Sequence, residues 1–240
     1  MSHAEHLRPD PTSELWGEHR ARYRFAARYV RGKRVLDIAC GAGFGLAILR
    51  QAGAYVVGMD LDADALREAQ MTTGPRLAQA NGMLLPVADD RLDVVTSFET
   101  LEHVGDAAAL VAELRRVIRP GGTLILSTPN REFGPPTTNP FHIQEFSPAE
   151  LHALLGQAFA DVTIYGQWPE PSYRFVPFKM LDPDYSRAAL TWKVVNRLPF
   201  GVKDALARAV NGRPWYPGET QYCFSEDRTD GAHALVAVAA

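Results

Sequence analysis

A glycine-rich turn between an apolar segment and a helix is the part of the sequence that most directly predicts chemistry. Residues 35–45 read VLDIACGAGFG, a buried strand that ends in closely spaced glycines. Such a turn brings backbone N–H groups against a ligand, because glycine has no side chain in the way. A second apolar run, residues 55–59, ends in Asp60, which can accept hydrogen bonds from both hydroxyls of a ribose. Together these segments predict a site for a nucleoside-bearing cofactor.

The spacing of the glycines argues against a dinucleotide. The dinucleotide fingerprint requires G-x-G-x-x-G, and Leu46 stands where its third glycine belongs. The third glycine of this chain, Gly45, comes one residue earlier. Asp37 lies within the preceding strand, where its carboxylate would repel a diphosphate but would suit a cationic amine. A nicotinamide-dependent dehydrogenase therefore fits less well than a protein that binds a cationic nucleoside.

The strand aspartate, the compact turn and the ribose-binding acid resemble the class I S-adenosylmethionine (SAM)-dependent methyltransferases, whose first motif is D/E-x-G-x-G-x-G. Here the pattern reads Asp37-x-Ala39-x-Gly41-x-Gly43, so alanine replaces one glycine. Residues 81–86, 91–98 and 119–129 then resemble, in the same order, the family's D-A-x-x-L-P segment, its fourth strand and the turn into its fifth strand.

The resemblance implies which residues contact SAM. Asn81 replaces the acid that binds the adenine amino group, so its carbonyl oxygen would accept that hydrogen bond, and Gly82 or Met83 would offer a backbone N–H to the ring. A helix before the first strand would partly cover the cofactor. The full set of expected cofactor contacts is Tyr23, Asp37, Ala39, Gly41, Gly43, Asp60, Leu61, Asn81, Gly82, Met83 and Phe98.

Methyl transfer to an oxygen requires in-line positioning and removal of the hydroxyl proton, so a base or a metal is needed. In residues 97–103, SFETLEH, the side chains of Glu99, Glu102 and His103 are spaced i, i+3 and i+4 and share a face if the segment is helical. The segment resembles the ubiquinone-biosynthesis O-methyltransferase family, which implies a magnesium site; the histidine suits manganese or zinc equally well. Alternatively, the glutamates favour a helix start and His103 packs locally.

A second group of candidates lies in residues 139–147, NPFHIQEFS, which resemble an H-x-x-E-F-[ST] segment of many bacterial methyltransferases. His142 has a side-chain type suited to accept a proton at neutral pH. Glu145 could orient it or bind a substrate hydroxyl, and the alternative is that both side chains anchor the loop. The expected catalytic residues are therefore His142, Glu145 and His103.

Length, charge and cysteine content limit the class of protein. The 240 residues are enough for one large α/β core, and the net charge of −3 provides no basic footprint for nucleic acid. Cys40 and Cys223 do not make a disulfide framework. The sequence shows neither a signal core nor an apolar run of about 18 residues that could span a membrane. We expect a cytoplasmic protein, with monomer and homodimer both open.

Alternating apolar and amphipathic segments predict an α/β fold, and the family resemblance implies a Rossmann-like, seven-stranded, mostly parallel sheet flanked by helices. Helices are expected at residues 14–30, 44–52, 63–71, 107–118 and 148–158. Ser147, Pro148 and Glu150 form a capping-box signature for the last of these. Besides the strand before the glycine turn, strands are expected at residues 55–59, 77–80, 91–98, 123–129, 162–165 and 234–239.

Four regions follow from this pattern: a helical segment at 1–30, a SAM-binding core at 31–167, an insert at 168–230 and a last strand at 231–240. The insert is too long for a structureless loop, so we expect a substrate cap or dimerisation element with helices near 188–196 and 202–210.

The predicted function is SAM-dependent O-methylation of a small molecule, with a saccharide or glycan intermediate as the favoured acceptor. That preference comes from the resemblance of residues 142–146 and 216–225 to enzymes of glycan pathways. Metal-assisted methylation of a quinone or polyphenol is one alternative, and a SAM-binding protein without transferase activity is another. The base-methyltransferase motif N-P-P-Y is absent, which argues against nucleic acid as acceptor.

Overall fold

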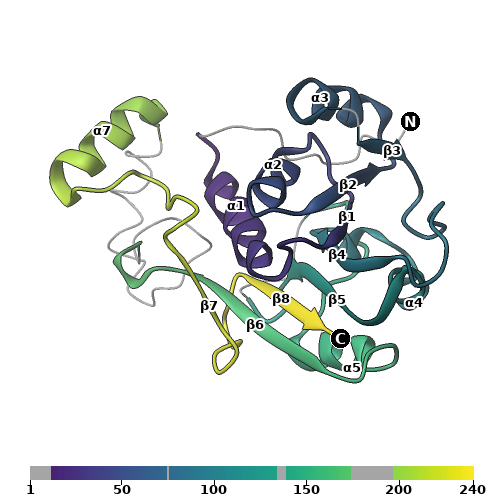
Figure 1. Ribbon diagram of the computed structural model, residues 1–240. Coiled ribbons are helices and arrows are strands. Elements are labelled where there is room, and N and C mark those ends of the chain that lie inside the picture. The colour runs from purple at the N-terminus through teal and green to yellow at the C-terminus, as the bar shows by residue number, and fades with distance from the viewer. Residues whose placement is uncertain (1–11, 75, 134–138, 174–196) are drawn as a thin grey trace. The chain divides into compact units, whose positions relative to one another are not determined.

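The computed structural model describes residues 12–74, 76–133, 139–173 and 197–240. In these residues helices alternate with strands that join one eight-stranded sheet (Figure 1). The strands are β1 (Arg34–Ile38), β2 (Tyr55–Asp60), β3 (Leu77–Gln79), β4 (Leu92–Phe98), β5 (Ile118–Pro129), β6 (Val162–Pro169), β7 (Tyr222–Ser225) and β8 (Ala234–Ala239). The α-helices are α1 (Glu14–Ala26), α2 (Phe44–Gln51), α3 (Ala63–Thr73), α4 (Ala107–Val117), α5 (Pro148–Leu155) and α7 (Phe200–Asn211).

The sheet is mostly parallel, which confirms the predicted fold class. Parallel pairing joins β3 to β2, β2 to β1, β1 to β4 and β4 to β5, whereas β8 runs antiparallel between β5 and β6. The strand order is β3-β2-β1-β4-β5-β8-β6-β7, so the sheet has eight strands and not the predicted seven. The added strand, β7, was missed because it is short and follows a segment rich in turn residues.

The strand order explains why the predicted site residues lie together. β1 lies between β2 and β4, so the chain turns in opposite directions after β1 and after β4, and open α/β sheets bind their ligands at the carboxyl ends of the strands beside such a point. Asp37 lies in β1, Asp60 ends β2 and Phe98 ends β4. The fold therefore brings the cofactor candidates and the acceptor-side candidates to one edge of the sheet.

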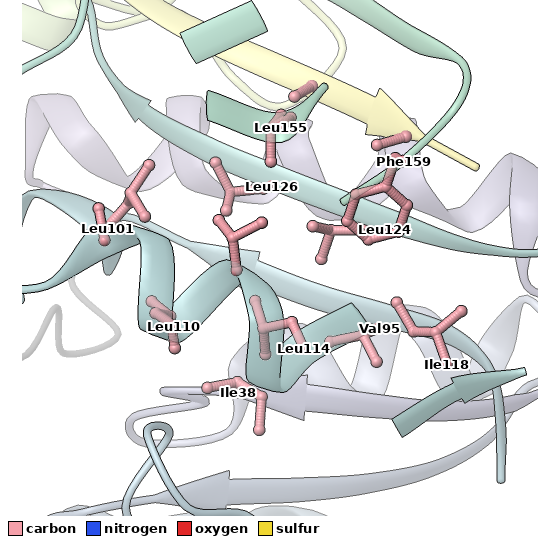
Figure 2. Packing of buried hydrophobic residues seen from close by; sticks show 14 of the residues in the cluster. Ile38, Val95, Leu101, Leu110, Leu114, Ile118, Leu124, Leu126, Leu155 and Phe159 are labelled. Carbon is pink, nitrogen blue, oxygen red and sulfur yellow. The ribbon is translucent and has the colours of Figure 1, made fainter. Parts of the chain in front are cut away.

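Alternate residues of the central strands pack on opposite faces of the sheet. Leu36 and Val95 belong to a buried cluster that also contains residues of α4 and α5 (Figure 2). Their neighbours Val35 and Val94 belong to a second cluster, with residues of α1 and α2. Each fully buried leucine or valine of this kind contributes about 1.5–3 kcal/mol, so burial on both faces fixes the strand ends that carry the site.

The helices agree with the predicted pattern, with small differences at their ends. Ser147 caps α5 as predicted: its hydroxyl accepts from the backbone N–H of Glu150 at 3.2 Å, and the Glu150 carboxylate accepts from the N–H of Ser147 at 2.9 Å. The helix expected at 14–30 is α-helical to Ala26 and continues as a 3-10 turn, Ala27–Tyr29. α7 contains the expected helix at 202–210, whereas the one near 188–196 lies outside the described residues.

The described chain falls into two compact units. The first contains residues 22–168 and 224–240, and therefore the whole of the site described below. The second combines the beginning of α1 with the described residues between 169 and 223. Among the described helices, none has the length and apolar character needed to cross a membrane.

Candidate functional site

The glycine turn after β1 owes its shape to backbone conformations that only glycine adopts without strain. Gly41 and Gly43 have φ angles of 51° and 79°. A Cβ at Gly43 would come within 2.8 Å of the Ala69 Cβ, so this glycine also lets α2 approach α3. Ala39, which replaces the family's first glycine, has φ 55° and carries about 1–2 kcal/mol of left-handed strain. Ala39 thus adopts the left-handed conformation that a glycine would adopt without strain.

Gly45, the glycine that comes too early for a dinucleotide fingerprint, makes room for Tyr23. A Cβ on Gly45 would overlap the Tyr23 ring. That ring stands edge-on to Phe44 and Phe98, with centroid separations of 5.4 and 4.8 Å. Its hydroxyl donates to Asp37 Oδ2 at 2.9 Å. Sequence reasoning placed Tyr23 at the cofactor but missed this pairing, because nothing in the local pattern links α1 to α2.

Asp37 is completely buried and fully hydrogen-bonded by side chains. Besides Tyr23, Thr96 donates its hydroxyl to Asp37 Oδ1 at 2.6 Å. Burial, with a smaller contribution from nearby Asp60, raises the pKa of Asp37 to about 7, although the two hydrogen bonds oppose this shift. The carboxyl group is therefore poised between its neutral and ionised forms near neutral pH. A cation bound beside it would favour the ionised form.

Asp60 ties the end of β2 to the glycine turn. Its Oδ2 accepts from the backbone N–H of Gly41 at 2.7 Å, and its Oδ1 accepts from the N–H of Asp62 at 2.8 Å. A carboxylate has about four acceptor positions, so both oxygens can still accept from ribose hydroxyls. The next residue, Leu61, has 63% of its surface exposed, which leaves an apolar side chain available to a ligand.

Two of the residues predicted to bind adenine, Asn81 and Met83, are hydrogen-bonded to each other. Asn81 accepts on its side-chain oxygen from the backbone N–H of Met83 at 2.9 Å. This turn places Asn81, Gly82 and Met83 after β3, beside the end of β2, because Ala80 donates its N–H to the Asp60 carbonyl at 3.0 Å. The segment is in the expected position, and its contacts with adenine stay a prediction.

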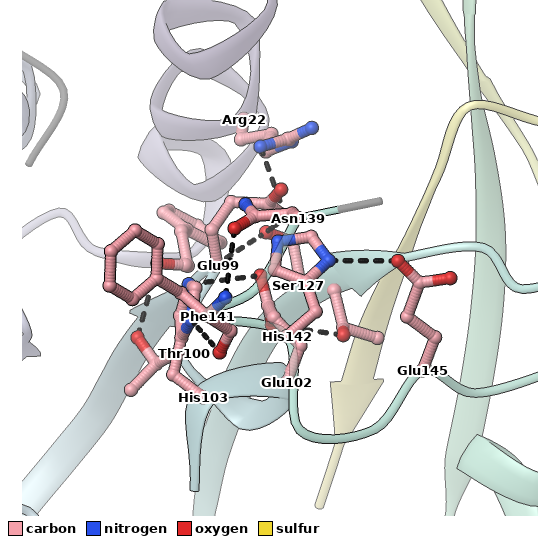
Figure 3. A network of polar contacts seen from close by, with 12 residues as sticks. Arg22, Glu99, Thr100, Glu102, His103, Ser127, Asn139, Phe141, His142 and Glu145 are labelled. Atoms are coloured by element: carbon pink, nitrogen blue, oxygen red, sulfur yellow. Dashed lines mark hydrogen bonds and ion pairs between the residues drawn. The ribbon is translucent and has the colours of Figure 1, made fainter. Parts of the chain in front are cut away.

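On the acceptor side, Glu99 pairs with a buried arginine (Figure 3). Its Oε1 accepts from the Ser127 hydroxyl at 2.9 Å and lies 3.2 Å from an Arg22 guanidinium nitrogen. Arg22 is 1% exposed, and its Nε donates to the Gln167 side chain at 2.7 Å. Glu99 has φ 50°, so residues 99–103 do not form the single helix that would place three side chains on one face. Only Leu101–His103 is helical, as a 3-10 turn.

Glu102 is buried with one oxygen satisfied and one not. Thr128 donates its hydroxyl to Glu102 Oε2 at 3.0 Å, whereas Oε1 has no hydrogen-bond partner among the described residues. Burial raises the pKa of Glu102 well above its usual value, and repulsion from Glu99 adds to the shift. The backbone carbonyl of Glu102 accepts from the N–H groups of Ile143 and Gln144 at 2.8 and 3.3 Å. These bonds attach the 139–147 loop to the Leu101–His103 turn.

The same attachment brings the two candidate histidines together. The His103 and His142 rings meet edge-on with centroids 5.1 Å apart. His103 Nδ1 lies 2.9 Å from the Phe141 carbonyl oxygen, and His142 Nδ1 lies 2.8 Å from Glu145 Oε1. Since both partners accept, each Nδ1 carries the proton, and the lone pair of each neutral ring lies on Nε2. Each histidine can thus accept a proton or bind a cation through Nε2.

The structure therefore sorts the predicted acceptor-side residues into two groups. Glu102, His103 and His142 each offer one ligand atom, and these atoms all lie within 4.8 Å of one another. Glu99, predicted as a metal ligand, instead belongs to the pair with Arg22. The sequence presented residues 97–103 and 139–147 as two separate groups of candidates. The backbone hydrogen bonds between these segments show that they form one cluster.

Comparison with known proteins finds relatives of this chain. Residues 36–126 match a family model described as a methyltransferase domain. A probable S-adenosylmethionine-dependent methyltransferase of Mycobacterium tuberculosis is 32% identical over 206 residues, which cover 83% of this chain and 69% of the relative. A ubiquinone biosynthesis O-methyltransferase of Methylococcus capsulatus is 37% identical over 142 residues, 54% of this chain and 59% of the relative. The matched part of the chain thus spans 69% of the length of the first of these relatives and 59% of the second.

Solved structures show the same fold. A SAM-dependent methyltransferase of Thermotoga maritima, described as a possible histamine N-methyltransferase, superposes with a TM-score of 0.63 and 15% identity. The match covers 94% of this chain and 90% of that one. At this level of identity the likeness concerns the fold alone.

Proposed function

Because this chain belongs to the SAM-dependent methyltransferases, we propose that it transfers the methyl group of SAM to a hydroxyl oxygen of a small molecule. The observation that carries the proposal is the hydrogen bond of 2.8 Å between His142 Nδ1 and Glu145, which leaves His142 Nε2 as a proton acceptor. His142 belongs to the 139–147 loop, which backbone hydrogen bonds attach to the turn that follows β4, at the carboxyl edge of the sheet. A neutral amine is a stronger nucleophile than a hydroxyl and attacks before it loses a proton, so it would need such a base less.

We assign the cofactor to the part of this sheet edge where β1, β2 and β3 end. Asp60 would bind the ribose hydroxyls, and the Asn81–Met83 turn would bind adenine. Asp37, with its pKa near 7, would ionise beside the ammonium of the methionine part. Tyr23 and Thr96 would keep that carboxylate in position through their hydrogen bonds.

In the transfer step the acceptor oxygen attacks the methyl carbon in line with the carbon–sulfur bond. The bond to sulfur breaks as the new carbon–oxygen bond forms, and S-adenosylhomocysteine leaves with the electron pair. The hydroxyl proton passes to His142 Nε2, and Glu145 stabilises the resulting imidazolium through Nδ1–H. Base assistance of this kind contributes about 10²–10⁴-fold, and positioning contributes on the order of 7–11 kcal/mol.

A saccharide hydroxyl is the acceptor that we favour, because residues 142–146 and 216–225 resemble segments of glycan-pathway enzymes. An aliphatic hydroxyl is weakly acidic and depends strongly on a base, which fits the paired His142 and Glu145. A phenolic hydroxyl is the second candidate, since relatives of this chain are named for ubiquinone biosynthesis. Phenols of the tyrosine type ionise near pH 10, so they would depend less on His142.

The test is methyl transfer from labelled SAM to a panel of saccharides and a panel of catechols. With a saccharide, His142→Ala should lower turnover about 10²–10⁴-fold, and with a catechol the loss should be smaller. His152→Ala, at an exposed position on α5, is the matched control and should behave as wild type. Equal turnover by His142→Ala and wild type, or transfer to amines alone, would overturn the proposal. Binding of SAM without transfer to either panel would instead support a SAM-binding protein without activity.

A further inference from the structure

We propose that Glu102, His103 and His142 form a binding site for one divalent transition-metal ion of the zinc, manganese or cobalt type. The ligand atoms are Glu102 Oε1 and the Nε2 atoms of the two histidines. The inference deepens the proposed function, and rests on it only for what the ion does in the reaction. Binding of the ion itself requires neither SAM nor an acceptor.

The distances leave room for an ion among the three side chains. One ligand atom from each lies within 4.8 Å of the others, and His103 Nε2 is 3.8 Å from Glu102 Oε1. Metal bonds to such ligands are about 2.0–2.2 Å long, so ligand atoms at a tetrahedral angle on one ion lie about 3.4 Å apart. Side-chain movements of at most about 1 Å for each ligand are therefore enough to close the site.

Each ligand is already oriented by a second partner. His142 donates Nδ1–H to Glu145, and His103 donates Nδ1–H to the Phe141 carbonyl, at 2.8 and 2.9 Å. Glu102 Oε2 accepts from the Thr128 hydroxyl at 3.0 Å. Histidines that bind metals characteristically donate their other ring N–H to a carboxylate or a backbone carbonyl, which fixes the lone pair toward the ion. Both kinds of partner occur here.

The free oxygen of Glu102 is an independent sign of a missing cation. The Glu102 side chain is 1% exposed, and its Oε1 has no hydrogen-bond partner in the described residues. A buried carboxylate oxygen without a partner is costly, because water no longer solvates it. A metal ion bound to Oε1 would remove that cost, and His103, whose Nε2 lies 3.8 Å from Oε1, would be bound to the same ion.

The donor set disagrees with the magnesium site that the family resemblance implied. That site needs Glu99, but Glu99 Oε1 is engaged by Ser127 and Arg22. A bound Arg22 guanidinium would also repel a second cation placed at Glu99. With His142 in place of Glu99, the site has two imidazoles and one carboxylate, a set that suits zinc, manganese, iron or cobalt and not magnesium, which prefers oxygen ligands.

Three protein ligands leave further coordination positions for water or an acceptor oxygen. A bound ion would lower the pKa of a coordinated hydroxyl. His142 Nε2 cannot hold an ion and a proton at once, so the ion and the free histidine are alternative activators of the acceptor. In metal-loaded protein His142 would act on the acceptor through the ion, whereas in metal-free protein it would accept the hydroxyl proton directly.

The test measures metal binding directly. The untagged 240-residue protein is freed of metal with a chelator, dialysed, and titrated with Co²⁺ and with Zn²⁺. Isothermal titration calorimetry measures the heat of binding, and visible absorption monitors the bound Co²⁺. Wild type should bind one ion per chain. His103→Ala and His142→Ala should each weaken binding at least 100-fold, and Glu145→Gln, which removes an orienting partner, about 10–100-fold. Glu99→Gln and His152→Ala should bind as wild type.

Circular dichroism of each variant verifies that it is folded, and X-ray absorption of the Zn²⁺-loaded wild type provides a measurement that needs no variant. It should show imidazole scattering from two histidines. Unchanged affinity in His103→Ala and His142→Ala, loss of binding in Glu99→Gln alone, or a spectrum without imidazole would each overturn the inference. Because no acceptor is present, failure here is separate from failure of methyl transfer, and a chain that binds the ion but methylates no hydroxyl would refute only the proposed function.

Discussion

The proposed cofactor side and the proposed acceptor side of this site differ in how far apart in sequence their contacting residues lie. On the cofactor side, residues 37–45 and Asp60 follow one another on adjacent strands, and Asp60 is bonded directly to the Gly41 N–H. On the acceptor side, Glu102 and His142 meet only because the Glu102 carbonyl binds the N–H groups of a distant loop. The first arrangement is formed by residues close together in sequence, whereas the second depends on long-range contacts.

This difference implies different consequences of mutation. A change on the cofactor side should alter backbone geometry and SAM affinity together. A change on the acceptor side should alter stability or turnover while SAM affinity stays the same. The predictions below separate the two, in order of decreasing effect.

The largest effect is expected at Arg22, which is buried and paired with Glu99. Arg22→Met removes one member of a buried ion pair and should lower the free energy of unfolding by about 3–5 kcal/mol. Urea denaturation measures this loss. The double variant Arg22→Met with Glu99→Gln should recover part of it, since no unpaired charge remains. An equal loss in the single and double variants would show that the ion pair is not the cause.

Gly45→Ala tests the packing of α2 against Tyr23. The added Cβ overlaps the Tyr23 ring, so overpacking and a weakened bond to Asp37 should together cost about 2–4 kcal/mol. In a Tyr23→Ala background the same substitution should be nearly neutral, because the space is empty and alanine favours the helix. The double-mutant cycle is measured by urea denaturation, and additive effects would contradict the assigned role of Gly45.

Asp37 should make both stability and SAM binding depend on pH. Its folded pKa of about 7 lies above its ordinary value of 3.8, so the folded chain keeps a proton that the unfolded chain releases. Without ligand, the stability contributed by this group should therefore be largest at low pH and fall between about pH 4 and 7, by at most about 1.4 kcal/mol per pH unit.

The ligand reverses the direction of this effect. A bound ammonium favours the Asp37 carboxylate, so affinity for S-adenosylhomocysteine should rise from about pH 5.5 to 7 and then level off, with proton release below pH 7. Calorimetry in buffers of different ionisation enthalpy measures both. Asp37→Asn should bind weakly with no such rise, and a pH-independent affinity in wild type would contradict the assigned contact.

The smallest effect is expected at Ala39, where the chain departs from the family's glycine. Because Ala39 has φ 55°, Ala39→Gly should relieve left-handed strain of about 1–2 kcal/mol while losing about 0.5–1 kcal/mol through the freer unfolded chain. The net gain should be about 0.5–1 kcal/mol in thermal or urea denaturation. A destabilised glycine variant would mean that the Ala39 methyl group packs favourably.

The fold and the turn between β1 and α2 could be predicted from sequence because their signals are local. Apolar periodicity predicted the strands and helices, and the capping residues predicted the start of α5. The cofactor contacts of the glycine turn and Asp60 stay a prediction. β7 was missed because so short a strand produces no clear period.

The acceptor side was only partly predictable. His103, His142 and Glu145 stay predicted catalytic residues, chosen from their residue types, and their arrangement depends on backbone bonds between segments far apart in sequence. Residues 99–103 do not form the single helix that would place Glu99, Glu102 and His103 on one face, because Glu99 has a positive φ. The Tyr23–Asp37 pair likewise needs the tertiary position of α1, which no local pattern provides.

The most direct test of the two-sided account is calorimetry of S-adenosylhomocysteine binding to Asp60→Ala and His142→Ala beside wild type. Asp60→Ala should weaken binding about 5–150-fold, because buried hydrogen bonds to the ribose and to the Gly41 N–H are lost. His142→Ala should bind with wild-type affinity even where its turnover has fallen. Equal weakening in both variants, or no binding by wild type, would contradict the account.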